Sequence, residues 1–322
     1  MKEKYALVTG GAGFIGSNLT RALLIKGINV VVYDNFSTGS RKNLPEDQGG
    51  KLTIIEGNIL DLKKLTRIME GIEVVFHNAA RVTIRDSLDN FLEDAETNLM
   101  GTINVIKASV DKKVKKFIFA SSMAVYGDKE SPAKEEDVLK PIVPYGLSKR
   151  AAEEYCLYAN ERYGLNAVIL RYFNTYGQNQ AISSNVGVIN SFIDQLLRGE
   201  SLTIFGDGDQ VRDFVHVDDV VRANLLVLEK EMEAEVFNIG TGRGISINEL
   251  ARHLREKIKT DVKIEHGGSV VSEARYSVAD ITKAQRGLGY RPRIKLEEGI
   301  ERTIKWIREN TRRVDQLWNQ KL

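Results

Sequence analysis

Cysteine, histidine and excess charge are all scarce in this chain of 322 residues. Its single cysteine, Cys156, excludes a disulfide within one chain and a cysteine-based metal site, and it fits a reducing compartment. The four histidines show no metal-ligand spacing, so we expect no metal. With 46 Lys and Arg against 44 Asp and Glu, the net charge of +2 does not indicate nucleic acid binding.

Long apolar runs and a signal peptide are also missing from the sequence. No apolar stretch approaches the roughly 20 residues of a membrane span, and residues 1–4 lead directly into a strand-like run. These absences predict a soluble, cytoplasmic protein without membrane contact. The length allows two domains or one large domain, with ample core.

A glycine-rich turn near the start is the first motif that carries chemistry. The apolar run Tyr5–Thr9 predicts a strand, and the turn after it places Gly10, Gly13 and Gly16 before a helical pattern. Such glycines allow a tight turn, close approach of a pyrophosphate and close helix packing, in that order. The next predicted strand ends in Asp34, whose carboxylate would bind the adenosine ribose and repel a 2′-phosphate. The pattern predicts NAD binding and favours NAD over NADP.

Strand-like and helix-like stretches alternate along the first half of the chain. Repeated βα units predict an α/β fold with a Rossmann-type, doubly wound parallel sheet that binds its ligand at the strands' C-terminal ends. The regularity fades after Asn174, which indicates a smaller, irregular C-terminal substrate domain. We expect an NAD-binding domain over 1–173, to which 213–240 returns, and a substrate-binding domain over 174–212 and 241–322.

Two of the predicted helices raise questions that spacing alone leaves open. A long amphipathic helix is expected over Phe91–Val110, and its polar Asn98 is either solvated or a buried hydrogen-bonding post. A second is expected over Ile300–Glu309, and the polar tail after it could form a surface helix.

Tyr145 and Lys149 lie four positions apart at the start of an alanine-rich amphipathic run. On a helix they would share one face. The lysine's charge would favour the phenolate and lower the pKa of the phenol from about 10 toward neutrality. Such a phenol can take a proton from an alcohol or return one to a ketone. Taken alone, the spacing fits an exposed helix face equally well.

Six short motifs follow one another along nearly the whole chain. They are Thr9–Gly16, Asp34–Gly39, Ser121–Gly127, Tyr145-x-x-x-Lys149, Arg171–Asn174 and Arg212–Asp219. In this order they resemble the extended short-chain dehydrogenase/reductase family, and within it the nucleotide-sugar 4-epimerases that act on UDP-glucose or UDP-N-acetylglucosamine.

The resemblance implies a mechanism and a set of site residues. Tyr145 would be the acid/base, Lys149 its partner and ribose ligand, and Ser122 the hydroxyl that bonds the sugar's O4, with Ser121 as the neighbouring alternative. Hydride would leave C4 and return to the other face, so NAD would stay tightly bound. The expected NAD contacts are Gly10, Gly13, Phe14, Ile15, Gly16, Asp34, Asn35, Ser37, Thr38, Gly39, Asn58, Ile59, Ala79, Ala80, Arg81, Asn98, Ser121, Tyr145, Lys149 and Phe173. The expected substrate contacts are Ser122, Tyr145, Asn174, Val188, Thr203, Ile204, Phe205, Arg212, Arg275 and Ser277.

Related enzymes on the same fold differ directly after the serine. The resemblance implies an Asp-Glu pair there in the 4,6-dehydratases and a glutamate in the UDP-glucuronate decarboxylases. This chain has Met123 and Ala124, which carry no protons, so epimerisation is favoured. The alternative from a different functional class is a non-catalytic regulator that binds NAD on the same fold. Such proteins typically lose the Tyr/Lys pair, which this chain keeps.

The substrate side departs from the usual pattern. Val270 stands where the resemblance places a diphosphate arginine, and Arg275 could supply that contact. Arg212 would bind the diphosphate or form a salt bridge to Asp213 or Asp218. Ser277 matches a tyrosine in epimerases restricted to non-acetylated sugars, so it either leaves room for a 2-acetamido group or fills a differently shaped wall.

The resemblance favours interconversion of UDP-GlcNAc and UDP-GalNAc, with UDP-glucose and UDP-galactose as the alternative pair. It also implies a homodimer built from the helices 91–110 and 146–163, with a UDP-sugar as the small-molecule partner.

Overall fold

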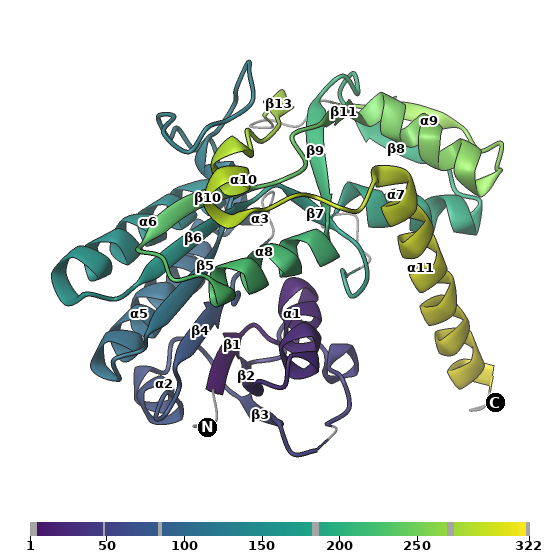
Figure 1. Ribbon diagram of the computed structural model, residues 1–322. Coiled ribbons are helices and arrows are strands. Elements are labelled where there is room, and N and C mark those ends of the chain that lie inside the picture. Colours follow the sequence, from purple (N-terminus) through teal and green to yellow (C-terminus); the bar gives the residue numbers. More distant parts are fainter. Residues whose placement is uncertain (1–4, 48, 83–85, 182–186, 269–273, 320–322) are drawn as a thin grey trace.

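The computed structural model describes residues 5–47, 49–82, 86–181, 187–268 and 274–319 (Figure 1). Its elements alternate between strand and helix as far as β6, and become less regular beyond it. In chain order they are β1 (Tyr5–Thr9), α1 (Phe14–Ile25), β2 (Asn29–Asp34), the 3-10 turn η1 (Arg41–Asn43), β3 (Leu52–Glu56), α2 (Leu62–Ile68), β4 (Val74–His77), α3 (Asp86–Asp89), α4 (Phe91–Ala95), the π-helical η2 (Glu96–Met100), α5 (Gly101–Asp111), β5 (Lys116–Ser122), the 3-10 turn η3 (Met123–Val125), α6 (Pro144–Tyr163), β6 (Ala167–Tyr172), β7 (Asn174–Tyr176), α7 (Val188–Arg198), β8 (Leu202–Phe205), β9 (Val211–His216), α8 (Val217–Glu229), β10 (Glu235–Ile239), β11 (Gly244–Ser246), α9 (Ile247–Ile258), β12 (Ile264–Gly267), β13 (Tyr276–Ser277), α10 (Thr282–Leu288) and α11 (Leu296–Asn319).

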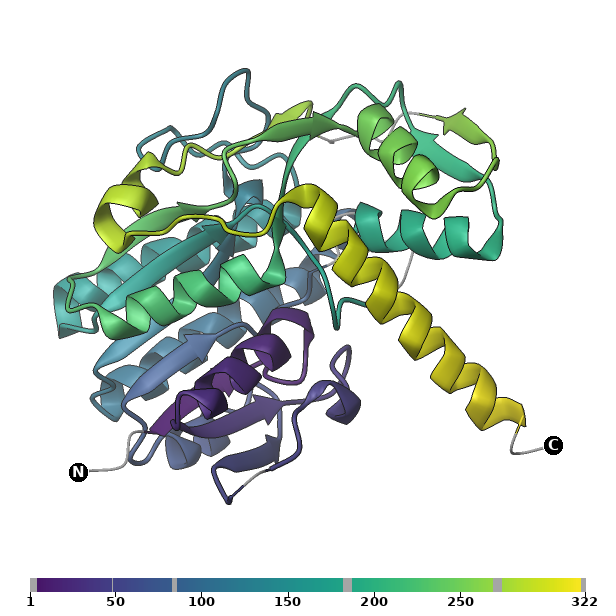
Figure 2. The ribbon, with the colours of Figure 1, turned by 45° about the vertical axis from the view of Figure 1, so that its right-hand side comes forward.

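A seven-stranded sheet with the order β10-β6-β5-β4-β1-β2-β3 forms the centre of the larger lobe. All its pairings are parallel, and α1, α8 and α10 pack on one face while α2, α5 and α6 pack on the other (Figures 1 and 2). Parallel strands buried on both faces need apolar side chains on both, as in β6, where all six residues are buried. The predicted doubly wound α/β fold is confirmed.

The smaller lobe joins short strands to the helices α7, α9 and α11. Its core combines the apolar faces of these helices with β8 and β9. Four strands form one small sheet, in which β9 pairs with β7, β11 and β13. A separate pair, β8 and β12, runs parallel beside α7 and α9 (Figure 2). The lobe therefore brings strand residues that are far apart in the sequence to the C-terminal side of the large sheet.

Two helices differ from the sequence-based expectation. The helical stretch expected over 91–110 contains a π-helical turn at Glu96–Met100, which places Asn98 in the wider part of the helix. The helix expected over 300–309 runs from Leu296 to Asn319 and includes most of the polar tail (Figure 2). The amphipathic pattern alone therefore did not fix the helix type at Glu96–Met100 or the two ends of α11.

Candidate active site

The glycine turn between β1 and α1 forms a cradle of bare backbone. Gly10 has a φ of +65°, and a Cβ on it would lie 2.7 Å from the backbone nitrogen of Ala79. The N-terminus of α1 has no side-chain cap and no acidic residue in its first turn, which contains Phe14 and Ile15. Exposed helix N–H groups without a competing carboxylate favour a bound phosphate. The turn fits the pyrophosphate of NAD.

The loop after β2 closes on this cradle. Asp34 is buried, and its two carboxylate oxygens accept hydrogen bonds from the backbone nitrogens of Ala12 (2.9 Å) and Phe36 (2.8 Å). Asn35 accepts hydrogen bonds from Ser37, and Gly39 packs against Ala12. The adjacent Thr38 is exposed. Asp34 is therefore held at a strand end beside the glycines, where the sequence predicts a ribose ligand.

Four further predicted NAD contacts follow strands of the large sheet. Asn58 and Ile59 follow β3, and the amide oxygen of Asn58 accepts from the backbone of Leu60 at 3.0 Å. Ala79 and Ala80 follow β4, and the Ala79 nitrogen donates to the Thr9 hydroxyl at 3.2 Å. The side chains of Ala79 and Ala80 are small, so a ligand could approach their backbone closely.

Asn98 is a buried hydrogen-bonding post, which answers the question that its position in the sequence left open. Its side chain accepts from the Arg81 backbone nitrogen at 2.8 Å and donates to the Arg81 carbonyl at 2.9 Å. The guanidinium of Arg81 is itself paired with Asp86 and Glu93. Asn98 therefore fixes the chain after β4, whereas the Arg81 side chain is engaged by carboxylates of its own lobe.

Tyr145 and Lys149 share the buried face of α6. The exposed fraction is 5% for Tyr145 and 2% for Lys149, which rules out an exposed helix face. The Ser122 hydroxyl is close enough to the Tyr145 phenol to lower the phenol's pKa. Gly146 permits this approach, because a Cβ there would lie 2.4 Å from the Ala124 carbonyl oxygen. The phenol, a serine hydroxyl and an ammonium thus converge at the C-terminal end of β5.

The expected lowering of the Tyr145 pKa by Lys149 is wrong for the protein on its own. The Lys149 Nζ lies 6.0 Å from the Tyr145 ring centroid and donates instead to the Ala120 carbonyl at 2.9 Å. Burial raises the pKa of Tyr145 above its usual value, although the nearby Ser122 hydroxyl lowers it. Burial also lowers the pKa of Lys149 to about 8. Desolvation therefore dominates at both groups, and a phenolate would need a further positive charge at the site.

Ser121 and Ser122 have different partners, which separates their roles. The Ser121 hydroxyl donates to Glu153 at 2.5 Å, and Glu153 forms a buried ion pair with Arg171 at 2.6 Å. Tyr126 completes this cluster by accepting from Arg171 at 2.8 Å. Because Ser121 is bound to a buried carboxylate, Ser122 is the serine directed to Tyr145.

The Glu153–Arg171 pair was not foreseen from the sequence. A signal was present, since Glu153 continues the four-residue spacing of Tyr145 and Lys149 along α6. Met123 and Ala124 form η3 directly after Ser122, so no acidic side chain occupies the positions that follow the serine.

Three predicted substrate contacts are gathered by the small sheet around β9. Arg212 pairs in register with Ser277 of β13, and Asn174 of β7 donates from its side-chain amide to the Asp213 carbonyl at 3.2 Å. Arg212 and Asp213 point to opposite faces of β9, as neighbours on a strand do. The Asp213 carboxylate accepts hydrogen bonds from Thr241, Gly242 and Ala279, and Asp218 pairs with Arg302.

The predicted substrate contacts on β8 do not share one face. Along β8, Thr203 and Phe205 are exposed, whereas Ile204 is 1% exposed and belongs to the core of the smaller lobe. Val188 begins α7 and packs against the same core. Phe173 is buried beside Tyr126. Of these three β8 side chains, only those of Thr203 and Phe205 could therefore contact a ligand.

Arg275 lies at the rim of the smaller lobe. Its guanidinium pairs with Asp207 at 2.6 Å, and its backbone nitrogen donates to Asp128, also at 2.6 Å. Asp207 belongs to the turn after β8. Val270, where the sequence lacks the usual arginine, lies outside the described residues.

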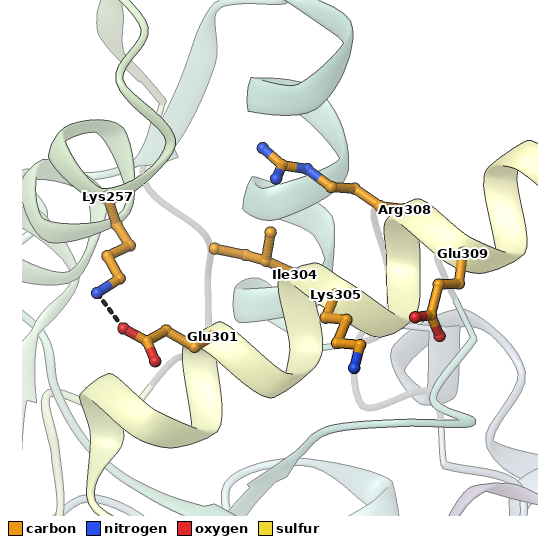
Figure 3. A pocket seen from close by; sticks show the side chains of 6 residues that line it. All are labelled: Lys257, Glu301, Ile304, Lys305, Arg308 and Glu309. Atoms are coloured by element: carbon orange, nitrogen blue, oxygen red, sulfur yellow. Dashed lines mark hydrogen bonds and ion pairs between the residues drawn. The ribbon is translucent and has the colours of Figure 1, made fainter.

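A separate hollow lies between α9 and α11, remote from Tyr145. Its charges are mixed, and Lys257 is paired with Glu301 across it. Figure 3 shows the residues that line it, which are Lys257, Glu301, Ile304, Lys305, Arg308 and Glu309. Its charges nearly balance and it holds no group suited to proton transfer, so we do not assign the nucleotide-sugar site to it.

The described ranges contain neither a metal-binding cluster nor a membrane-spanning helix. Within them, no cluster of three or more His, Cys, Asp or Glu side chains could hold a metal ion. The helices described there also lack the combination of length and apolar character needed to cross a bilayer.

Comparison with known proteins identifies the family. Residues 6–240 match the NAD dependent epimerase/dehydratase family. The structure resembles UDP-glucose 4-epimerase from Thermotoga maritima with UDP-glucose (TM-score 0.92, 41% identity, 95% of this chain and 99% of the other). It also resembles UDP-N-acetylglucosamine 4-epimerase from Methanobrevibacter ruminantium with UDP-N-acetylmuramic acid (0.91, 35%, 96% and 100%). A third similar structure is UDP-glucose 4-epimerase from Thermus thermophilus with NAD (0.88, 33%, 94% and 99%).

These matches confirm the resemblance seen in the sequence and the expectation of NAD as cofactor. The chain belongs to the NAD dependent epimerase/dehydratase family.

Proposed function

We propose that the protein is a UDP-sugar 4-epimerase that interconverts UDP-N-acetylglucosamine and UDP-N-acetylgalactosamine through a 4-keto intermediate. The convergence of Tyr145, Ser122 and Lys149 beside the glycine cradle carries this proposal. The apolar pair Met123–Ala124 supports epimerisation over dehydration or decarboxylation, because it offers no acid or base for a second step.

Each side chain has a task in that reaction. Bound in the glycine cradle, NAD supplies a hydride acceptor that is restored in every cycle, and its positive charge favours the phenolate. Tyr145 takes the proton of the 4-hydroxyl through or beside Ser122 and later returns it. Lys149 holds its charge beneath the phenol, fixed by the Ala120 carbonyl. Asp34 accepts the hydroxyls of the adenosine ribose.

The choice of sugar rests on Ser277. It is buried in β13 and pairs in register with Arg212 of β9, the strand whose Asp213 carbonyl accepts a hydrogen bond from Asn174. A serine leaves more space there than a tyrosine, which suits a 2-acetamido group. The similarity to the Methanobrevibacter enzyme supports this sugar, whereas the Thermotoga enzyme supports the alternative, UDP-glucose and UDP-galactose.

We further propose a homodimer in the cytoplasm. Large apolar side chains are exposed on α4, η2 and α6, the helices that the family resemblance places at a dimer interface. They are Phe91, Leu92, Met100, Leu147, Tyr155 and Tyr158. Apolar surface of this kind favours burial against a second copy.

The test is turnover without added cofactor. Purified protein is incubated separately with UDP-GlcNAc and UDP-glucose, and the C4 epimers are quantified. We expect epimer from UDP-GlcNAc at the higher kcat/KM; no epimer from either sugar would refute the epimerase.

Replacing the acid/base gives the matched variants. Tyr145→Phe should lower kcat by roughly 10²–10⁴-fold, the usual contribution of a positioned acid/base, while bound NAD is retained. Tyr163→Phe, at an exposed tyrosine near the end of the same helix, should keep full activity. A fully active Tyr145→Phe protein would remove the tyrosine from its role.

A further inference from the structure

A buried carboxylate, Asp94, faces the helix that carries the candidate acid/base. It comes from α4, and its residue is 1% exposed. Its Oδ2 accepts a hydrogen bond from the side-chain amide of Asn98 at 2.7 Å. The other oxygen, Oδ1, is buried and has no hydrogen-bond partner within the described residues.

Asp94 lies against the turn of α6 between Tyr145 and Lys149. The hydroxyl of Ser148, in that turn, is close enough to stabilise the carboxylate, although it donates to the Tyr145 carbonyl at 3.0 Å. Among the charged neighbours of Lys149, Asp94 has the strongest effect in keeping the ammonium protonated. Its charge also opposes ionisation of Tyr145.

The other ionisable groups around the pair are neutral or already paired. Glu153, on α6, is matched by Arg171 of β6. His77 of β4 is neutral, because burial lowers its pKa to about 3, and burial raises the pKa of the Cys156 thiol. In the described part of the chain, Asp94 is thus the carboxylate beside the pair that forms no ion pair of its own.

The Asp94 carboxylate has support from neighbouring charges. Burial raises its pKa, while Ser148, Asn98 and the charges of Lys149 and Arg81 lower it. The guanidinium of Arg81 contacts Asp86 and Glu93, so it acts on Asp94 only from a distance.

We infer that Asp94 is a positioning residue whose negative charge balances Lys149, keeping the ammonium charged and restraining premature ionisation of Tyr145. The inference deepens the proposed function, on which the catalytic meaning of the pair rests. The same carboxylate also accepts a hydrogen bond from Asn98, which in turn accepts one from the backbone of Arg81 after β4. Asp94 therefore both supports this backbone and places a negative charge near Lys149.

The isosteric change Asp94→Asn separates charge from shape. An amide oxygen can still accept from Asn98, but the negative charge is gone. A negative charge raises the pKa of both an acid and an ammonium near it, so its removal should lower the pKa of Tyr145 and that of Lys149 together. Turnover needs ionised Tyr145 and charged Lys149; therefore both limbs of the pH profile should move to lower pH.

The holoenzyme is tested in two ways. The first is the pH profile of kcat/KM with the sugar that turns over, where we expect both limbs of Asp94→Asn to move down by about one pH unit. The second is a ¹³C NMR titration of tyrosines labelled at Cζ, with Tyr145 assigned by its loss in Tyr145→Phe. Its midpoint should fall by a similar amount. The NMR result stands even if no sugar is turned over, so failure of the proposed function is distinguishable.

Control variants decide between charge and structure. Glu96→Gln removes an exposed carboxylate two residues after Asp94 and should shift neither limb of the pH profile of kcat/KM. Asp94→Glu restores the charge and should return the limbs toward wild type, and Asp94→Ser offers a second neutral variant if the asparagine protein does not fold. A slower enzyme with unmoved limbs and an unmoved Tyr145 midpoint would overturn the inference.

Discussion

Two ion pairs of similar length show how differently the halves of the site are built. Under the reacting groups, Glu153 and Arg171 meet at 2.6 Å with side chains only 3% and 5% exposed. At the rim of the smaller lobe, Arg275 and Asp207 also meet at 2.6 Å, but each side chain is 55% exposed. The distances are equal, whereas the surroundings are opposite.

The difference in burial implies a difference in function. A buried pair cannot lose one partner without leaving an uncompensated charge in a dry environment, so it fixes geometry. An exposed pair is screened by water and can exchange partners at little cost. Under the proposed function, the buried pair fixes the side of the site that transfers protons, and the substrate side keeps an arginine that could leave its carboxylate for an anion.

Breaking the buried Glu153–Arg171 pair should cause the largest loss, which is one of folding stability. Glu153→Ala leaves Arg171 without its carboxylate and Ser121 without its acceptor, which we expect to cost about 3–5 kcal/mol of unfolding free energy. Denaturant unfolding measures this directly. The matched control is Asp111→Ala, which breaks the exposed pair with Lys107 and should cost less than about 1 kcal/mol. If Glu153→Ala and Asp111→Ala both lowered the unfolding free energy by the same small amount, buried and exposed ion pairs would not differ in this protein.

The sequence predicted the local geometry of the glycine turn, of Asp34 and of the Tyr145–Lys149 helix face, whereas the roles of these residues stay predictions. Glycines after a strand, an acid at the end of the next strand and a tyrosine four residues before a lysine each depend on short-range geometry, which spacing reveals. The sheet followed from repeated βα units. The family and its cofactor followed from the order of the motifs.

Ion pairs between residues far apart in the sequence could not be predicted from spacing. Arg171 contacts Glu153 only because β6 lies beneath α6, and Arg275 contacts Asp207 only because β13 begins beside the turn after β8. The sequence also overestimated the influence of Lys149 on Tyr145, since burial of both groups cannot be read from a spacing of four. The π-helical turn at Glu96–Met100 left no signal in the hydrophobic pattern.

Filling the sugar side should produce an intermediate effect that depends on substrate. Ser277→Tyr adds a ring beside Arg212, in space that a 2-acetamido group would need under the proposed function. We expect kcat/KM for UDP-GlcNAc to fall by roughly 10–200-fold, the range that pocket volume commonly controls, and that for UDP-glucose to fall much less. Ser277→Thr, which adds one methyl group, is the matched control and should change the ratio little. Equal losses on both sugars would show that Ser277 merely shapes the wall.

The smallest effect is expected at the exposed pair, and its direction is informative. Arg275→Ala should leave thermal unfolding unchanged, because the pair with Asp207 lies in solvent. If the arginine exchanges its carboxylate for the substrate diphosphate, KM should rise about tenfold with kcat little changed, as for the loss of one charge-assisted hydrogen bond. Asp207→Asn releases the same arginine and should lower KM instead, whereas Arg252→Ala on α9 should do neither. Unchanged KM values in both Arg275→Ala and Asp207→Asn would mean that Arg275 does not bind the substrate.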